Sequence, residues 1–150
     1  KLLGKRATGK FFNPSSGPCY YGELPLAFAV CTNQPEMVRV LLNAGADLTL
    51  QDEANGNNAA HMAVLFNLPE MYDLLRAEWN ARKQSGKVEC LTDRPNKFGQ
   101  GCLALAAAEG RREIFEHVLR SRSTVHWSYG QVVCLHHPTE GLDEGLHCSE

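Results

Sequence analysis

The sequence has no long apolar run and no excess of basic residues. No stretch approaches the roughly 18 consecutive apolar residues of a membrane-spanning helix, and no signal-peptide pattern follows Lys1. The 15 Lys and Arg residues are outnumbered by 17 Asp and Glu residues, which gives a formal net charge of −2. This balance supplies neither a nucleic-acid footprint nor a basic membrane patch. We therefore expect no nucleic-acid partner and no entry of this segment into a membrane.

The chain does have enough apolar material for a core. Its 150 residues are 43% hydrophobic and 21% charged, which excludes a wholly disordered chain and fits about one domain. Six cysteines are scattered along the sequence, and without a secretory signal they indicate a reducing, cytosolic setting. Because the first residue is Lys rather than Met, we expect the chain to be a piece of a longer protein.

Three segments repeat one pattern of glycine, alanine, proline and leucine. Residues 22–47 align with residues 56–76 at a constant offset of 34, and residues 99–119 continue the series at an offset of 43. The nine additional residues fall in the connection between 76 and 98. Self-similarity at such a period is typical of proteins in which similar units stack side by side.

Each repeat predicts two helices separated by a short polar break. Pro35 and Pro69 suit a first helical turn, where the missing N–H costs nothing, and Asn58 is a plausible N-cap. One such helix pair cannot bury its apolar face alone, so neighbouring pairs should share a continuous core. The first helices are expected over 24–31, 58–65 and 101–108, and the second helices over 35–43, 69–78 and 112–121.

The first complete repeat resembles an ankyrin repeat. GELPLAFA over 22–29 is similar to the ankyrin signature G-x-T-P-L-H-x-A, and LLNAGAD over 41–47 is similar to its ending. The alternative is a generic array of helical hairpins. The resemblance implies an all-α ankyrin-repeat solenoid with three full repeats, the remnant of a preceding one and long loops between repeats. The expected divisions are the remnant and its loop over 1–21, repeats over 22–55, 56–98 and 99–122, and a post-repeat tail over 123–150. The residues expected to carry the repeat signature are Gly22, Pro25, Leu26, Ala29, Leu41, Leu42, Gly56, His61, Ala63, Leu75, Gly99, Leu103, Ala106 and Leu119.

Three motifs in order resemble a narrower group, the cytosolic ankyrin domain of vanilloid-type transient receptor potential channels. They are RATGKFF over 6–12, CYYGELPL over 19–26 and, after the last repeat, WSYG over 127–130. The resemblance implies a protein-interaction and subunit-assembly segment of a calcium-permeable cation channel. Such a segment would lie at the cytosolic face of the plasma membrane, in a homo- or hetero-tetramer. A soluble ankyrin adaptor without a channel domain remains the alternative.

Four loop aromatics are the candidate contacts with protein partners. Phe11 and Phe12 lie in a segment bordered by Gly and Pro, and Trp127 and Tyr129 follow the last predicted helix. In the family that this chain resembles, loops of one subunit meet the post-repeat linker of the next, so these four residues are expected to be assembly contacts. The alternative is that Trp127 and Tyr129 fold back over the adjacent repeat.

No catalytic, metal or cofactor site emerges from the sequence. The P-loop-like string over 4–11 ends in Phe where the mechanism needs a Mg²⁺-binding hydroxyl. Cys102 lies at the start of an apolar helix and should be inert, and His61 is expected to be a structural hydrogen bonder between adjacent repeats. We therefore expect neither an enzyme nor a cofactor, and no nucleotide site, because the earlier repeats that contact nucleotides in some family members are missing. A small zinc-binding module remains an alternative, using Cys134, His136, His137, His147 and Cys148.

Overall fold

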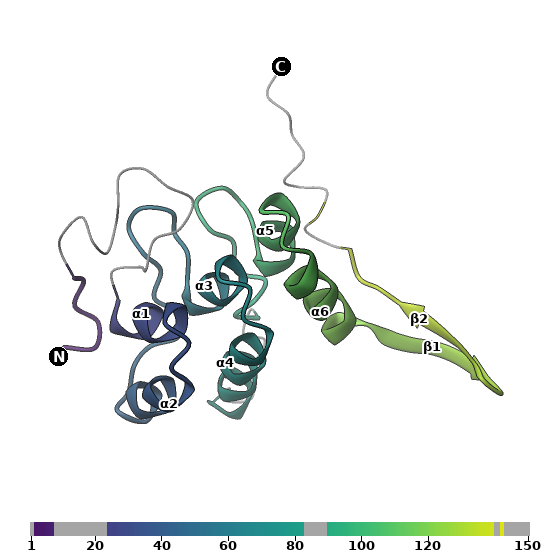
Figure 1. Cartoon of the computed structure of the whole chain (residues 1–150), viewed down its shortest axis with the longest axis horizontal. Coiled ribbons are helices and arrows are strands. Elements are labelled where there is room, and N and C mark those ends of the chain that lie inside the picture. The colour runs from purple at the N-terminus through teal and green to yellow at the C-terminus, as the bar shows by residue number, and fades with distance from the viewer. Residues whose placement is uncertain (1, 8–23, 83–89, 140–141, 143–150) are drawn as a thin grey trace, which may run out of the picture.

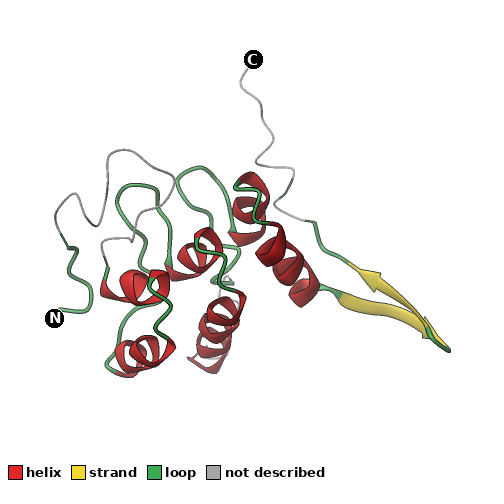
Figure 2. Cartoon of the chain, in the orientation of Figure 1, coloured by secondary structure: helices red, strands yellow, loops and turns green. Residues whose placement is uncertain are grey.

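Three helix pairs followed by a two-stranded hairpin make up the computed structural model, which describes residues 2–7, 24–82, 90–139 and 142 (Figure 1). The helices are confirmed to within one residue of their predicted bounds, except that α4 continues to Arg82. The expectation of a wholly helical chain is wrong, because the tail forms an antiparallel β-hairpin (Figure 2). The elements are α1 (Pro25–Cys31), α2 (Pro35–Asn43), α3 (Ala59–Leu65), α4 (Pro69–Arg82), α5 (Cys102–Ala108), α6 (Arg112–Arg122), β1 (Thr124–Tyr129) and β2 (Val132–His136).

One turn geometry joins the two helices of every pair. Asn33, Asn67 and Gly110 all adopt a left-handed backbone, with φ of 52°, 53° and 63°. In the first pair the N–H groups of Asn33 and Gln34 donate to the carbonyls of Val30 and Ala29, both at 2.9 Å. The same two bonds recur after α3 and α5, and they close the helix C-terminus as a Schellman motif. The left-handed positions keep the sequence offsets of 34 and 43, so the repeat is structural as well as sequential.

The first helices of the pairs, α1, α3 and α5, form an inner row and pack against one another in chain order (Figure 1). Every residue of α3, the central helix, is buried. Ala29, Ala63 and Ala106 are 2%, 0% and 0% exposed, and their small side chains let the inner helices approach closely. Other signature residues that lie in the core are Leu26, Leu42, His61, Leu75 and Leu103.

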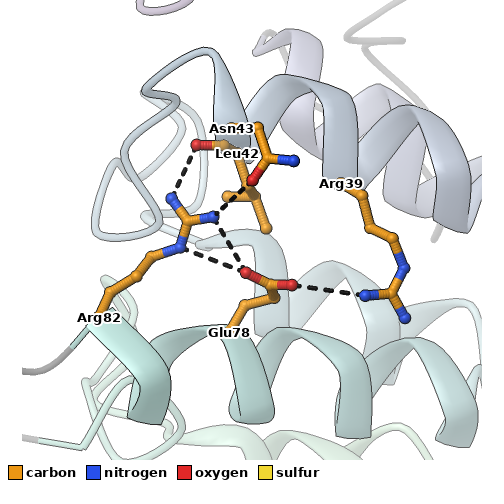
Figure 3. Close-up of polar contacts among 5 residues, drawn as sticks. All are labelled: Arg39, Leu42, Asn43, Glu78 and Arg82. Carbon is orange, nitrogen blue, oxygen red and sulfur yellow. Dashed lines mark hydrogen bonds and ion pairs between the residues drawn. The ribbon is translucent and has the colours of Figure 1, made fainter.

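A polar cluster joins α2 to α4 in the outer row (Figure 3). The guanidinium Nη1 of Arg82 donates to the carbonyl of Leu42 at 2.7 Å, and its Nη2 lies 3.0 Å from Oε2 of Glu78. The other carboxylate oxygen of Glu78 lies 3.5 Å from Nη1 of Arg39. Arg82 therefore gives the carbonyl of Leu42, at the end of α2, a second donor besides the backbone N–H of Gly45, which bonds the same oxygen at 3.1 Å. The additional turn of α4, which the sequence assigned to an insertion, positions this arginine.

Substitutions at Leu42 and Leu41 test which side of α2 forms the core. Leu42 is 1% exposed, whereas Leu41, which is also a predicted signature residue, is only partly buried. Leu42→Asp would bury an unpaired carboxylate and should lower the free energy of unfolding by about 4 kcal/mol or more. Leu41→Asp leaves its carboxylate near water and should cost about 1–2 kcal/mol. Urea unfolding followed by circular dichroism measures both, and equal losses would contradict this assignment of the core.

Candidate interaction surface

Two inter-repeat loops lie side by side on one side of the inner helices. The backbone N–H of Lys97 donates to the carbonyl of Asn55 at 2.9 Å, and the side-chain amide of Gln51 donates to the carbonyl of Pro95 at 2.9 Å. Gly56 has φ of 72°, and a Cβ there would lie 2.8 Å from the backbone nitrogen of Lys97. Only glycine therefore fits where the loops approach each other. The sequence predicted a tight turn at this position but not this contact.

His61 ties the middle repeat to the loop of the next one. Its Nε2 donates to the carbonyl of Gln100 at 3.0 Å, which leaves Nδ1 to accept from the backbone N–H of Asn58 at 3.2 Å. The side-chain oxygen of Asn58 in turn accepts from the backbone N–H groups of Ala60 and His61 and caps α3. Burial is the main cause that lowers the pKa of His61 to about 4, so the ring is neutral at pH 7. This is the structural role that the sequence predicts.

The β-hairpin projects away from the helix stack beyond α6 (Figure 1). Its two-residue loop begins at Gly130, which has φ of 58° at the first central position, where a type II′ turn requires a left-handed residue. Trp127 pairs with Cys134 and Tyr129 pairs with Val132 across the ladder. These four side chains share one face of the hairpin, because cross-strand partners and alternate residues point the same way.

Both faces of the hairpin are apolar and exposed. On the aromatic face, Trp127 is 49% exposed and Tyr129 is 84% exposed. The pairing shifts register between Val125 and Trp127, so Val125 pairs with Leu135 on the opposite face, where Val133 lies beside them on β2. All three of these aliphatic residues are exposed. An apolar surface of this kind on both sides of a thin ribbon is typical of an interaction element.

The base of the hairpin is fixed to α6 and to the preceding loop. The hydroxyl of Ser123 donates to the carbonyl of Leu119 at 2.7 Å. It also contacts Nδ1 of His137, the residue that directly follows β2. Nη2 of Arg122 lies 3.1 Å from Oδ1 of Asp93. These contacts hold both ends of the ribbon at the last repeat, so the exposed residues are presented in a defined direction.

The structure thus corrects one alternative for the predicted contact residues. Trp127 and Tyr129 do not fold back over the adjacent repeat, because both remain exposed on the projecting ribbon. Phe11, Phe12 and Gly22 lie outside the described residues, as do residues 8–11 of the P-loop-like string. Sequence reasoning missed the aliphatic face of Val125, Val133 and Leu135, although the apolar stretches on either side of Gly130 carry a hairpin signal.

The structure bears on two predictions about reactive groups, the inert thiol of Cys102 and the zinc alternative. Cys102 is fully buried, and burial raises the pKa of its thiol, so the sulfur stays protonated at neutral pH. Within residues 2–7, 24–82, 90–139 and 142, no three His, Cys, Asp or Glu side chains come together as metal ligands. His147 and Cys148, which the zinc alternative needs, lie outside this part of the chain.

Comparison with known families identifies the repeat type. The sequence matches a model described as ankyrin repeats in three copies, over residues 2–86 and 26–127. No helix in the described part of the chain has the length and apolar character needed to cross a membrane.

Several curated relatives are similar to this chain over most of its length. It is 37% identical over 130 residues to transient receptor potential cation channel subfamily V member 5 of Mus musculus, which covers 83% of the chain and 17% of the relative. Member 6 of Homo sapiens is 36% identical over 135 residues, covering 85% of the chain and 17% of the relative. Member 2 of Mus musculus is 37% identical over 147 residues, covering 85% of the chain and 19% of the relative. The chain therefore spans less than a fifth of each of these relatives.

The neutral state of His61 makes stability depend on pH. In the unfolded chain its pKa returns to about 6.5, whereas the folded value is about 4. Between these values the unfolded chain binds more protons, so stability is lost as the pH falls from about 6.5 towards 4. We expect the His61 contribution to fall by roughly 2 kcal/mol between pH 7 and pH 5.

Urea unfolding at a series of pH values measures this loss. The variant His61→Gln should be less stable at pH 7 but should show a flatter pH dependence in this window. An equally steep dependence in His61→Gln would show that another group titrates.

Proposed function

The chain belongs to the ankyrin-repeat family, and we propose that it is a protein-interaction and subunit-assembly segment of the cytosolic ankyrin domain of a calcium-permeable cation channel. Similarity to three subfamily V channels over 83–85% of the chain supports the link to a channel. Ion permeation would belong to parts of the protein outside this chain, since no described helix is suited to span a membrane.

The observation that carries the assembly role is the projecting hairpin with its exposed aromatic face. Trp and Tyr are the residues most enriched among energetic anchors at protein interfaces. Here Trp127 and Tyr129 alternate along β1 and lie together on a ribbon whose base is fixed by Ser123 and Arg122. A preorganised element loses little conformational entropy on binding, which favours its use as a contact between subunits.

The partner in this proposal is a neighbouring subunit of the same channel. The parent protein would form a homo- or hetero-tetramer, with this segment at the cytosolic face of the plasma membrane and with no nucleic-acid partner. Phe11 and Phe12 belong to the same proposal as contacts from the loop ahead of the first complete repeat. The repeats themselves, proposed to span 22–55, 56–98 and 99–122, would act as the rigid spacer between the two contact regions.

Photo-crosslinking tests the contact directly in the full-length protein. Tyr129→p-benzoylphenylalanine keeps an aromatic ring at the most exposed of the large apolar residues in the ribbon and should yield a covalent dimer of subunits on irradiation. Trp127→Ala in the same background should reduce the dimer yield by about tenfold, as expected for the loss of an interface anchor.

A matched control comes from α6. Arg112→p-benzoylphenylalanine places the same probe at an exposed position outside the hairpin and should give no dimer. Because Trp127 contributes little to the core, Trp127→Ala should leave the melting temperature within about 2 °C of the parent value. Equal crosslinking from both positions, or none from position 129, would contradict the proposed contact.

A further inference from the structure

A groove of about 410 Å³ lies between the outer helices α4 and α6. Asp73, Arg76 and Asn80 line it from α4, at spacings that place them on one face of the helix. His117, Arg120 and Ser121 line it from α6. The groove lies on different elements from the hairpin, so nothing inferred from it depends on the assembly role.

The two arginines of this groove differ from most of the others in the chain. Arg76 and Arg120 make no hydrogen bond or ion pair with another described residue. Most other arginines are engaged with a carboxylate or a carbonyl. Two guanidinium groups with free donors therefore share one concave site.

The nearby carboxylates are already taken by other partners. Glu116 lies one turn before Arg120, but its Oε1 bonds Nε of Arg112 at 2.8 Å. Glu113 accepts from the side-chain amide of Asn67 at 2.7 Å, and Glu78 pairs with Arg82. These acids are bonded to other residues, although the charge of Arg120 adds, after the larger effect of Arg112, to the lowering of the Glu116 pKa.

Asp73 is the only carboxylate that lines the groove in the described part of the chain, and it is also engaged. Its Oδ2 lies 2.9 Å from Nε2 of His117 on the opposite wall. The hydroxyl of Ser121 donates to the carbonyl of Val118 at 2.8 Å, so Asn80 supplies the neutral donor of the site. Arg76 and Arg120 bring two positive charges and Asp73 one negative charge, so these three side chains leave the groove with a net positive charge.

We propose that this groove binds a phosphate monoester group held between Arg76 and Arg120. Guanidinium groups match the geometry of phosphate oxygens and bond them in bidentate fashion, and two of them offer a dianion two positive charges, which the carboxylate of Asp73 partly offsets. A carboxylate carries one charge and is satisfied by a single fork. The lining contains no Phe, Tyr or Trp on which a base could stack, so the phosphate, rather than a nucleoside, is the recognised part.

Isothermal titration of the chain with glycerol 3-phosphate tests the proposal. Arg76→Ala and Arg120→Ala should each weaken binding by roughly tenfold or more, as expected for the loss of a charge-assisted hydrogen bond. Asp73→Asn removes the only acid of the groove and should strengthen binding severalfold.

Arg39→Ala is the matched control. It removes the same charge from the outer helix α2, outside the groove, and its ion-pair partner Glu78 stays bonded to Arg82. This variant should bind within about twofold of the parent chain, because a distant exposed charge is screened. Far-UV circular dichroism checks that all variants fold. Equal weakening by Arg39→Ala and Arg120→Ala, or no effect of Arg76→Ala, would overturn the site.

Vesicles distinguish the source of the phosphate. Phosphatidic acid presents the same monoester at a lipid surface, and vesicles of phosphatidylcholine alone serve as the blank. Binding of glycerol 3-phosphate without vesicle binding assigns a soluble ligand. Vesicle binding that Arg76→Ala and Arg120→Ala abolish, and Arg39→Ala retains, assigns a lipid headgroup. Both results support the site, whereas the absence of binding to either probe rejects it.

Discussion

The close approach of the three inner helices is the constraint on which the rest of the structure depends. Ala29, Ala63 and Ala106 occupy one position in successive repeats and are almost completely buried. A larger side chain at any of them would separate neighbouring repeats, because protein interiors are packed too tightly to absorb extra volume without strain. The spacing of the repeats, and with it the register of every loop, is therefore set by small residues in the core.

The loops turn this spacing into specific contacts. Gly56 permits the approach of Lys97, and His61 reaches the carbonyl of Gln100, only because the repeats stand at a fixed distance from each other. His61 is buried in its neutral form, and both of its ring nitrogens are bonded. A buried polar group is tolerated when its partners are in place. This network therefore stabilises one relative placement of the repeats, and other placements would leave buried polar groups unbonded.

The helices could be predicted well from the sequence because residues within one turn of each end determine where they begin and stop. Pro35 and Pro69 open helices, and Asn58 caps one, through effects that act within a single turn. The extension of α4 to Arg82 was missed because Arg82 is stabilised by a hydrogen bond to the carbonyl of Leu42, which lies about forty residues away in the chain. The hairpin was missed for a different reason. Family resemblance suggested a linker, and this outweighed the turn signal at Gly130 and the apolar residues around it.

The surfaces that can bind other molecules are those where the fold leaves apolar side chains exposed or charged groups without a partner. In the described repeats, the polar and reactive groups singled out from the sequence are used within the fold. His61 and Asn58 bond the loops, and Cys102 is buried as a thiol. Unsatisfied surface remains on the hairpin, where Trp127 and Tyr129 meet solvent, and on the outer helices, where Arg76 and Arg120 share a groove. Both regions lie off the inner row, so changes in either need not disturb the buried contacts between repeats. A stacked fold can therefore carry interaction sites at its end and along its outer helices while the core that fixes its spacing stays the same.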